Sequence, residues 1–284
     1  MTVKTITIIS LISNAYSISI DCPNMIDFAR GLGMVTQQPT IWSQLQTDCC
    51  TANGVTCASQ RVTQIVWNSM NLNGSINGAA LPSGLQLLDL GINLVDGILP
   101  NTWPDGLQNL YLYRNQLSGS ISSTWPSTLQ DLDLNSNQFI GSIPSSWPSG
   151  LHKLYLGSNK LTGSISILWP SGLQYLHLDN NSLSGDISSL PSTLIDLGLG
   201  YNRDLVFNQF TGSLVLNQPH YIYIYNNLVT DLVVYNFSSL VGNCDLSNNP
   251  LLGNPNIRNL TMCTKNGLFN ASLLQITTRN LTLI

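Results

Sequence analysis

The chain has 284 residues, of which 43% are hydrophobic and only 8% are charged, and its formal net charge is −4 at pH 7. It contains no basic tract of the kind that phosphate backbones attract, so the sequence excludes nucleic acid as an expected partner. All 14 acidic residues are aspartate, and asparagine, serine and glycine are abundant, which favours turns and short strands over long helices.

Residues 1–17 predict a secretory signal peptide. Lys4 precedes an apolar stretch, and small residues at Ala15 and Ser17 suit cleavage. The alternative is a first strand of the folded protein. No later run approaches the ~18 apolar residues that a membrane span needs. We therefore expect a secreted or extracellular protein, associated with a cell wall or cell surface, and no membrane span in this chain.

Residues 18–61 are expected to form a cysteine-rich cap with a helix-like segment, PNMIDFARGLGMV. Four of the six cysteines lie here, two lie near the other end of the chain, and none lies between. This placement suits disulfides that seal the two ends of an open core in an oxidising compartment. Four cysteines allow three connectivities, and a zinc site at the second pair is an alternative. The pairs that we expect are Cys22 with Cys49, Cys50 with Cys57, and Cys244 with Cys263.

Residues 62–256 are expected to form nine copies of one small unit. The segment LxxLxLxxNxLxGxI recurs every 22 residues from Leu85 to Leu173, and then one residue early at Leu194. A fixed period of this length predicts a solenoid, because a single unit cannot bury its own apolar face. The units begin at Val62, Leu85, Leu107, Leu129, Leu151, Leu173, Leu194, Pro219 and Val241.

Alternation within each unit predicts which side chains point inward. In LxxLxLxxN the second and third leucines point into the core and the residues around them point outward, so stacked units align into one parallel sheet. The asparagine that follows each strand, such as Asn137, can satisfy backbone groups of the turn. The glycine four residues further on, such as Gly141, suits a positive φ or close stacking.

Four tryptophans recur at the same period, and each precedes a proline. A residue before proline is pushed towards extended geometry, so each tryptophan is expected on an extended or turn segment, packed against its neighbours. Leu81 and Leu190 occupy the equivalent position in other units, which favours an apolar packing slot over a carbohydrate-binding ladder. The tryptophans are Trp103, Trp125, Trp147 and Trp169.

The segment DCCTANGVTCASQRVTQIVW, preceded by Trp42, resembles the cap of plant-type extracellular leucine-rich-repeat proteins, and FIGSIP resembles their repeat signature. The resemblance extends to CDLSNNPLLGNP, with residues 257–284 as a C-terminal cap and tail. It includes polygalacturonase-inhibiting proteins and receptor ectodomains. It implies an α/β solenoid that is mostly β: a right-handed leucine-rich-repeat coil with a parallel concave sheet, capped by disulfides at both ends. The repeats are shorter than is usual in that family, and a tryptophan common after the paired cysteines is missing.

The outward strand positions carry the expected binding surface. Eight of the ten tyrosines fall there, although tyrosine also suits β-strands intrinsically. Tyrosine is favoured at recognition surfaces, and the aspartates beside these tyrosines would steer a partner with a basic patch. The expected ligand-binding residues are Tyr111, Tyr113, Asp131, Asp133, Tyr155, Tyr175, His177, Tyr201, Tyr221, Tyr223 and Tyr225.

The seventh unit is interrupted by about six extra residues, from Arg203 to Asn208. Insertions in solenoids tend to project from one face, often the binding face. This insertion follows Tyr201 and precedes the YIYIY strand, so we expect a binding hot spot there. The alternative is a tolerated loop elongation.

Six NxS or NxT sequons are expected glycosylation sites in a secreted chain. One of them, at Asn180, lies at the edge of the predicted sheet, where a glycan would limit how a partner docks. The six asparagines are Asn73, Asn180, Asn236, Asn259, Asn270 and Asn280.

The sequence predicts a recognition module that binds a protein or peptide on its concave face. An inhibitor of a secreted polysaccharide-degrading enzyme and a structural or adhesive wall protein that contacts cell-wall polysaccharide are the alternatives. No enzyme, cofactor or metal site is expected, because no histidine has a nucleophile at a recognisable spacing. The best candidate cluster, His177 with Asp179 and Asp133, is read as plain surface.

Overall fold

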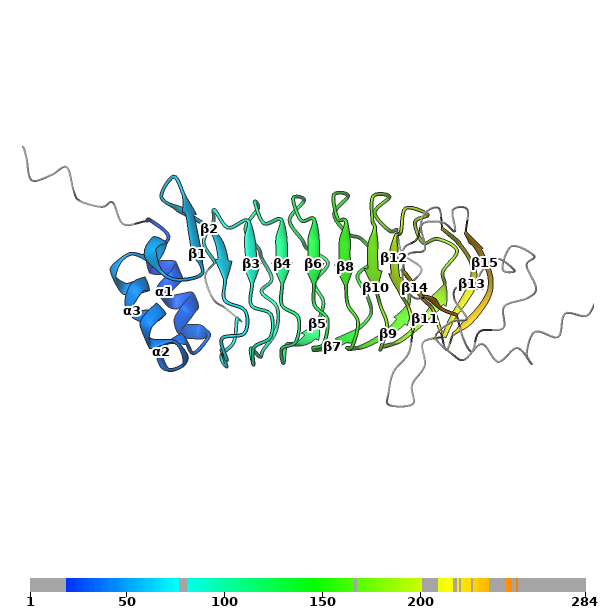
Figure 1. Cartoon of the computed structure of the whole chain (residues 1–284), viewed down its shortest axis with the longest axis horizontal. Coiled ribbons are helices and arrows are strands. Elements are labelled where there is room, and N and C mark those ends of the chain that lie inside the picture. The colour runs from blue at the N-terminus through cyan, green and yellow to red at the C-terminus, as the bar shows by residue number, and fades with distance from the viewer. Residues whose placement is uncertain are drawn as a thin grey trace, which may run out of the picture.

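The computed structural model describes residues 19–76, 81–165, 168–200, 209–216, 219, 221–225, 227–234, 244–246 and 249. The chain is a solenoid with a helical cap at one end (Figure 1). Several expectations lie outside the described residues: the signal peptide, Tyr201, the insertion at 203–208, Cys263, the C-terminal cap, and the sequons at Asn236, Asn259, Asn270 and Asn280.

The cap contains three helices, followed by a short 3₁₀ turn, η2, at Cys49–Thr51. Proline in the first turn of both longer helices, α1 and α3, suits a position where a backbone N–H has no helical partner. Phe28 is fully buried and stacks on Trp67, with ring centroids 6.0 Å apart, which joins the cap to the first coil. The helices are α1 (Cys22–Gly31), α2 (Met34–Gln37) and α3 (Pro39–Thr47).

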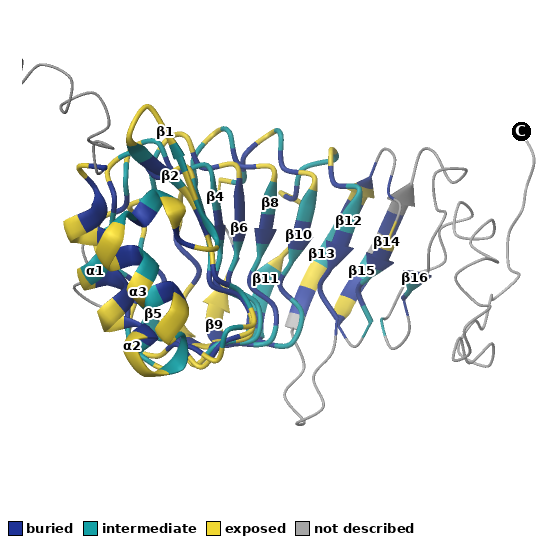
Figure 2. Ribbon diagram, turned by 60° about the vertical axis from the view of Figure 1, so that its left-hand side comes forward, coloured by how far each residue is buried: buried dark blue, intermediate teal, exposed yellow. Residues whose placement is uncertain are grey.

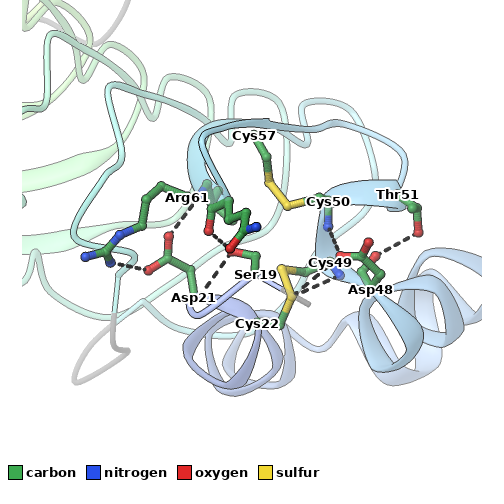
Figure 3. The surroundings of a disulfide bond; sticks show 11 residues. Ser19, Asp21, Cys22, Asp48, Cys49, Cys50, Thr51, Cys57 and Arg61 are labelled. Carbon is green, nitrogen blue, oxygen red and sulfur yellow. Dashed lines mark hydrogen bonds and ion pairs between the residues drawn. A yellow bond between two sulfur atoms is a disulfide. The ribbon is translucent and has the colours of Figure 1, made fainter. Parts of the chain in front are cut away.

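Both N-terminal disulfides form as predicted, Cys22–Cys49 and Cys50–Cys57 (Figure 3). The first closes a sequence separation of 27 residues. A loop of this size contributes roughly 3–4 kcal/mol in the chain-entropy model. All four sulfurs are therefore committed, which removes the zinc alternative. Asp21 adds a second tie: its carboxylate accepts hydrogen bonds from Arg61 Nη1 at 3.0 Å and from the Val62 N–H at 2.8 Å.

A long sheet runs the length of the solenoid. Its first strand, β1 (Val55–Ala58), pairs antiparallel with β2 (Arg61–Val66), and all later pairs are parallel. The inward leucines lie in register, for example Leu110 beside Leu132, and both are fully buried. The remaining strands are β3 (Leu87–Asp89), β4 (Asn109–Tyr111), β6 (Asp131–Asp133), β8 (Lys153–Tyr155), β10 (Tyr175–His177), β12 (Asp196–Gly198), β14 (Tyr221–Tyr223) and β16 (Cys244–Asp245).

A second parallel sheet, which the sequence analysis did not predict, follows the asparagine turns. It has six strands among the described residues, and β5, β7, β9 and β11 run along the lower edge of the solenoid in Figure 1. These strands are rich in serine and glycine, which have low strand propensity, so tertiary stacking overrides local preference. The strands are β5 (Ser118–Ser120), β7 (Gln138–Gly141), β9 (Lys160–Ser164), β11 (Ser182–Asp186), β13 (Gln209–Leu216) and β15 (Leu228–Val234).

The core between the two sheets continues from coil to coil (Figure 2). The asparagine of the turn satisfies backbone groups, as predicted, and in addition it joins adjacent coils. Asn137 is buried; its Nδ2 donates to the carbonyls of Leu112 and Leu134, and its Oδ1 accepts from the Leu117 N–H at 3.0 Å. Each such amide satisfies backbone groups of two coils at once. The repeating glycines also have positive φ, for example 80° at Gly119.

The model confirms the predicted fold class: a mostly β solenoid with parallel sheets and disulfides near its N-terminus. Cys244 is buried, and its expected partner lies outside the described residues. In the part of the chain that the structure describes, no helix has the length and apolarity needed to cross a membrane.

Candidate functional site

The side chains that point away from the core on the long sheet form what we call the outward face. Two of its columns are defined by strand register, and each column runs across neighbouring coils. The first column contains Leu87, Asn109, Asp131, Lys153, Tyr175, Asp196 and Tyr221. The second contains Asp89, Tyr111, Asp133, Tyr155, His177, Gly198, Tyr223 and Asp245.

All described members of the predicted site lie on these columns or directly after them. Tyr113 and Tyr225 stand two residues after Tyr111 and Tyr223, at the ends of their strands. Tyr201 is outside the described residues. The structure thus brings the predicted residues onto one surface, and their role in binding stays a prediction.

One hydrogen-bonded group on this face centres on Asp131, which is only 8% exposed. Lys153 Nζ donates to its carboxylate at 2.7 Å, and Tyr111 Oη donates to the same oxygen at 3.2 Å. Burial, followed by the charge of Asp131, raises the pKa of Tyr111 to about 12. Lys153 Nζ also lies 5.7 Å from the ring centre of Tyr175. Neighbouring coils are therefore cross-linked by side chains on the outward face.

Glycines make room for two of the tyrosine rings. A Cβ added at Gly91 would collide with the ring of Tyr113, and one added at Gly200 would collide with the ring of Tyr225. Each ring therefore rests on the backbone of the preceding coil. A tyrosine held in this way offers a stiff contact surface at low cost in side-chain entropy.

A second group lies at the middle of the face and includes two residues absent from the predicted site, Asp179 and Asp196. His177 Nε2 lies 2.9 Å from Asp196 Oδ1, and the His177 ring meets the ring of Tyr155 edge-on at 4.8 Å between centroids. Burial raises the pKa of Asp133 to about 6, although the Asn135 N–H that it accepts at 3.0 Å acts the other way. Burial likewise raises the pKa of Asp179.

The pKa of His177 is raised against the effect of its own burial. Burial lowers it, but the hydrogen bond and charge of Asp196, with the charges of Asp179 and Asp133, outweigh that effect. Burial, together with the charges of Asp196 and Asp133, also raises the pKa of the Tyr155 hydroxyl. Register places Asp196 beside Tyr175 and on the same face as His177, but it does not by itself indicate the contact between His177 and Asp196.

Gly157 leaves a gap between side chains of the neighbouring coils. A Cβ at this position would lie 2.8 Å from Asp179 Oδ1 and 3.1 Å from Asn135 Oδ1. Asn135 Oδ1 is buried and accepts no hydrogen bond from a described residue. Carbonyl and carboxylate oxygens thus converge above Gly157, which strengthens the negative character of the face.

Three of the four recurring tryptophans pack on one another, in agreement with the predicted packing role. Trp103 and Trp125 stack with ring centroids 5.9 Å apart, and Trp125 and Trp147 stack at 6.2 Å, with both pairs inclined by 18°. Leu190, in the equivalent slot of a later unit, is 7% exposed. A sugar ring stacks on the open face of an aromatic ring, and here those faces cover each other. The arrangement disfavours a carbohydrate ladder.

The two described sequons differ in accessibility. Asn73 is exposed, whereas Asn180 is half-buried and its Nδ2 donates to Ser158 Oγ at 2.6 Å. Asn73 therefore offers the freer amide. Glycosylation at both positions stays a prediction.

Among the described residues, one group has the spacing of metal ligands: Cys22, Asp48 and Cys49. Both of its sulfurs belong to a disulfide, and thiolate is the form of cysteine that binds metal. The group is therefore explained by the cap.

Fold and surface together define a protein built of stacked leucine-rich repeats, with an ordered tyrosine- and aspartate-rich face on its long sheet. The family model "Leucine Rich Repeat" matches residues 128–149 and 172–194. This match confirms the leucine-rich-repeat part of the resemblance over these residues, while its extracellular, plant-type and polygalacturonase-inhibitor-like details stay predictions. No curated protein matches the chain.

Solved structures with a similar coil include plant receptor ectodomains. The ectodomain of the receptor kinase SOBIR1 from Arabidopsis thaliana is 26% identical over 58% of this chain and 95% of its own, with a TM-score of 0.49. The Arabidopsis HAESA ectodomain, in complex with an IDA peptide hormone, is 19% identical over 81% of this chain and 56% of its own, with a TM-score of 0.34. A plant ice-binding protein is 20% identical over 82% of this chain and 95% of its own, with a TM-score of 0.45.

Proposed function

We propose that the protein is a secreted or cell-surface recognition module that binds a protein or peptide through the outward face. The observation that carries the proposal is the set of aromatic and acidic side chains held in order across neighbouring coils. Tyr113 and Tyr225 rest on glycine backbones, and Asp131 is fixed by Tyr111 and Lys153. Preordered aromatic residues lower the entropic cost of association, which is a property of strong binding surfaces.

The negative charge of the outward face indicates which kind of partner it would bind. Asp133, Asp179 and Asp196 lie close together, and His177 is the basic group nearest to them. A partner that presents lysine or arginine would be steered to this surface. The solved HAESA complex contains a peptide ligand, which accords with a peptide as the partner here.

Two further functions are compatible with a leucine-rich-repeat fold. Inhibition of a secreted polysaccharide-degrading enzyme is a special case of protein binding through the same face. A wall-associated structural role would need a surface for polysaccharide, and the stacked tryptophans do not provide one. The outward face offers binding groups but no nucleophile paired with a general base among its described residues, so we favour a binding protein over an enzyme.

The test is capture from extracellular and cell-wall extract by the full, oxidised chain, compared with a variant that carries alanine at Tyr221, Tyr223 and Tyr225. Loss of one hot-spot tyrosine should weaken binding by about 2 kcal/mol, so the triple variant should retain no partner. The matched control is Ile140→Ala, which removes a side chain that is 52% exposed on the second sheet.

A protein retained by the wild type and by the control, but not by the tyrosine variant, would support the proposal and identify the partner. Equal capture by all three forms would contradict the placement of the site. Capture of polysaccharide alone would favour the wall-associated role.

A further inference from the structure

We infer that the group at the middle of the outward face makes binding pH-dependent, so that a cationic partner held at neutral pH is released in mild acid. This inference rests on the proposed function and concerns regulation of the same face. We call the group the central cluster; it consists of Asp133, Tyr155, His177, Asp179 and Asp196.

The geometry couples the members of the cluster. His177 Nε2 contacts Asp196 Oδ1 at 2.9 Å, and these side chains keep only 28% and 20% of their accessible surface. Tyr155 closes the other side of the imidazole with an edge-on contact at 4.8 Å. A Cβ at Gly198 would lie 3.2 Å from the His177 ring and 3.1 Å from Asp179 Oδ1, so the ring and this carboxylate share one small space.

The charged and titratable groups around His177 are mostly acidic. From β8 come Lys153 and Tyr155, from β12 Asp196, from β6 Asp131 and Asp133, and from its own coil Tyr175 and Asp179. Lys153 is committed to Asp131 at 2.7 Å. Neither Asp133 nor Asp179 forms an ion pair with a described residue. His177 is therefore the group whose protonation can balance these half-buried carboxylates.

The physical chemistry gives the direction of the change. Burial raises the pKa of Asp133 to about 6 and raises that of Asp179, while the surrounding carboxylates raise the pKa of His177. As the pH falls from 7.5 to 5, Asp133 passes from largely ionised to largely neutral, and the imidazole carries its proton up to a higher pH than an ordinary histidine does. The cluster thus loses negative charge in a range where an ordinary aspartate would stay ionised.

The negative charge is lost from the central cluster, which is the part of the outward face expected to contact a cationic partner. Attraction between charges that are shielded from water is strong, and a positive imidazole would repel lysine or arginine. Tyr111 and Tyr113 lie three strands away from His177, and their hydroxyls do not titrate in this range. Acid therefore weakens the charged part of the interaction and leaves the aromatic part in place.

The first experiment needs no partner. Carboxyl and imidazole NMR titrations of the full chain should show Asp133 with a midpoint near pH 6 and His177 with a midpoint above its ordinary value. In the Asp196→Asn variant the midpoint of His177 should fall. Ordinary midpoints for both residues in the wild type would overturn the inference, whatever the capture experiment finds.

The second experiment uses a fluorescein-labelled hexa-arginine peptide as the probe, with binding measured at pH 7.5 and pH 5.0. The wild type should lose about tenfold in affinity on acidification, since neutralising close charges changes binding by an amount of this order. The double variant Asp133→Asn with Asp179→Asn should bind weakly at both pH values. The matched control is Asp186→Asn, an exposed aspartate on the second sheet, which should behave as the wild type does.

If the double variant does not fold, the single variant His177→Gln takes its place and should show a smaller acid-induced loss than the wild type. A pH-independent affinity of the wild type, or the same pH dependence in the cluster variants as in the wild type, would overturn the inference. Capture of a partner with the same yield at pH 5 as at pH 7.5 would support the proposed function and contradict its regulation by pH. Absence of any partner at pH 7.5 would contradict the proposed function, whereas the titrations and the hexa-arginine measurements test the pH dependence of the face separately.

Discussion

The two parallel sheets of the solenoid are made by the same coils, yet their outer surfaces are very different. The second sheet repeats small residues from coil to coil, for example Gly119, Gly141 and Gly163, each with positive φ. The long sheet places different, larger groups at equivalent positions, for example Tyr111, Asp133 and His177. Residue types repeat from coil to coil at positions where the stacking of coils requires one type. They vary at the outward positions of the long sheet, where stacking sets no such requirement, and these positions form the candidate site.

The largest difference between inward and outward positions is expected within a single strand. Leu176 is fully buried and Tyr175, its neighbour in β10, points to the outward face. Leu176→Ala should lower the free energy of unfolding by about 3 kcal/mol, because it removes buried apolar surface and leaves a cavity. Tyr175→Ala should cost about 1 kcal/mol or less. Urea unfolding of both variants measures the difference, and equal losses would contradict the assignment of inward and outward positions.

The turn between the two sheets allows a sharper test with two asparagines. Asn137 exchanges hydrogen bonds with the Leu117 N–H and with the carbonyls of Leu112 and Leu134. Asn137→Ala should lower the free energy of unfolding by about 2 kcal/mol, because buried backbone groups lose their partners.

The matched control is Asn135→Ala, because Asn135 Oδ1 accepts no hydrogen bond from a described residue. This substitution should change stability by less than about 0.5 kcal/mol. A reversed order of the two losses would show that the asparagine of the turn does not hold the coils together.

The raised pKa of Asp133 on the outward face should make the stability of the protein depend on pH. The pKa of Asp133 rises from 3.8 to about 6 on folding, so the folded state favours the protonated form. This contribution to stability is complete below pH 3.8 and is lost as the pH rises through 6. Asp133→Asn should therefore be more stable than the wild type at pH 7.5, by roughly 1–2 kcal/mol, and the difference should shrink towards pH 4.

Melting temperatures of the two proteins across this range provide the measurement. The control, Asp186→Asn on the second sheet, should show no such convergence. A wild type that is as stable as Asp133→Asn at pH 7.5 would contradict the raised pKa of Asp133.

Much of the fold was predictable because its signals are local and repeated. The inward leucines, the asparagine of the turn and the glycine with positive φ each follow from one residue type at one spacing. The cysteine pairs of the cap were also predicted, since Cys50 and Cys57 are close in sequence. The second sheet was missed because serine and glycine do not indicate strands by propensity. Apolar Phe139 and Ile143, which are both buried in the structure, were the signal available in the sequence.

The candidate site was predictable as a surface, but its internal contacts were less so. The alternation of side chains assigned Tyr155 and His177 to the outward face. The partnership of His177 with Asp196 depends on which coils are adjacent and on the one-residue shift at Leu194. The effect of burial on Asp133 depends on how much the neighbouring side chains cover it. Neither quantity can be read from the spacing of one repeat.

The interface between successive coils is the same along much of the chain, with leucine beside leucine and an asparagine amide at each turn. A surface of this kind is complementary to a copy of itself. Duplication or loss of one 22-residue unit, such as 129–150, would therefore lengthen or shorten the molecule by one strand, about 4.8 Å, without requiring a new core. The length of the outward face can thus change by whole units during evolution, while the chemistry of each unit is set separately by its own outward residues.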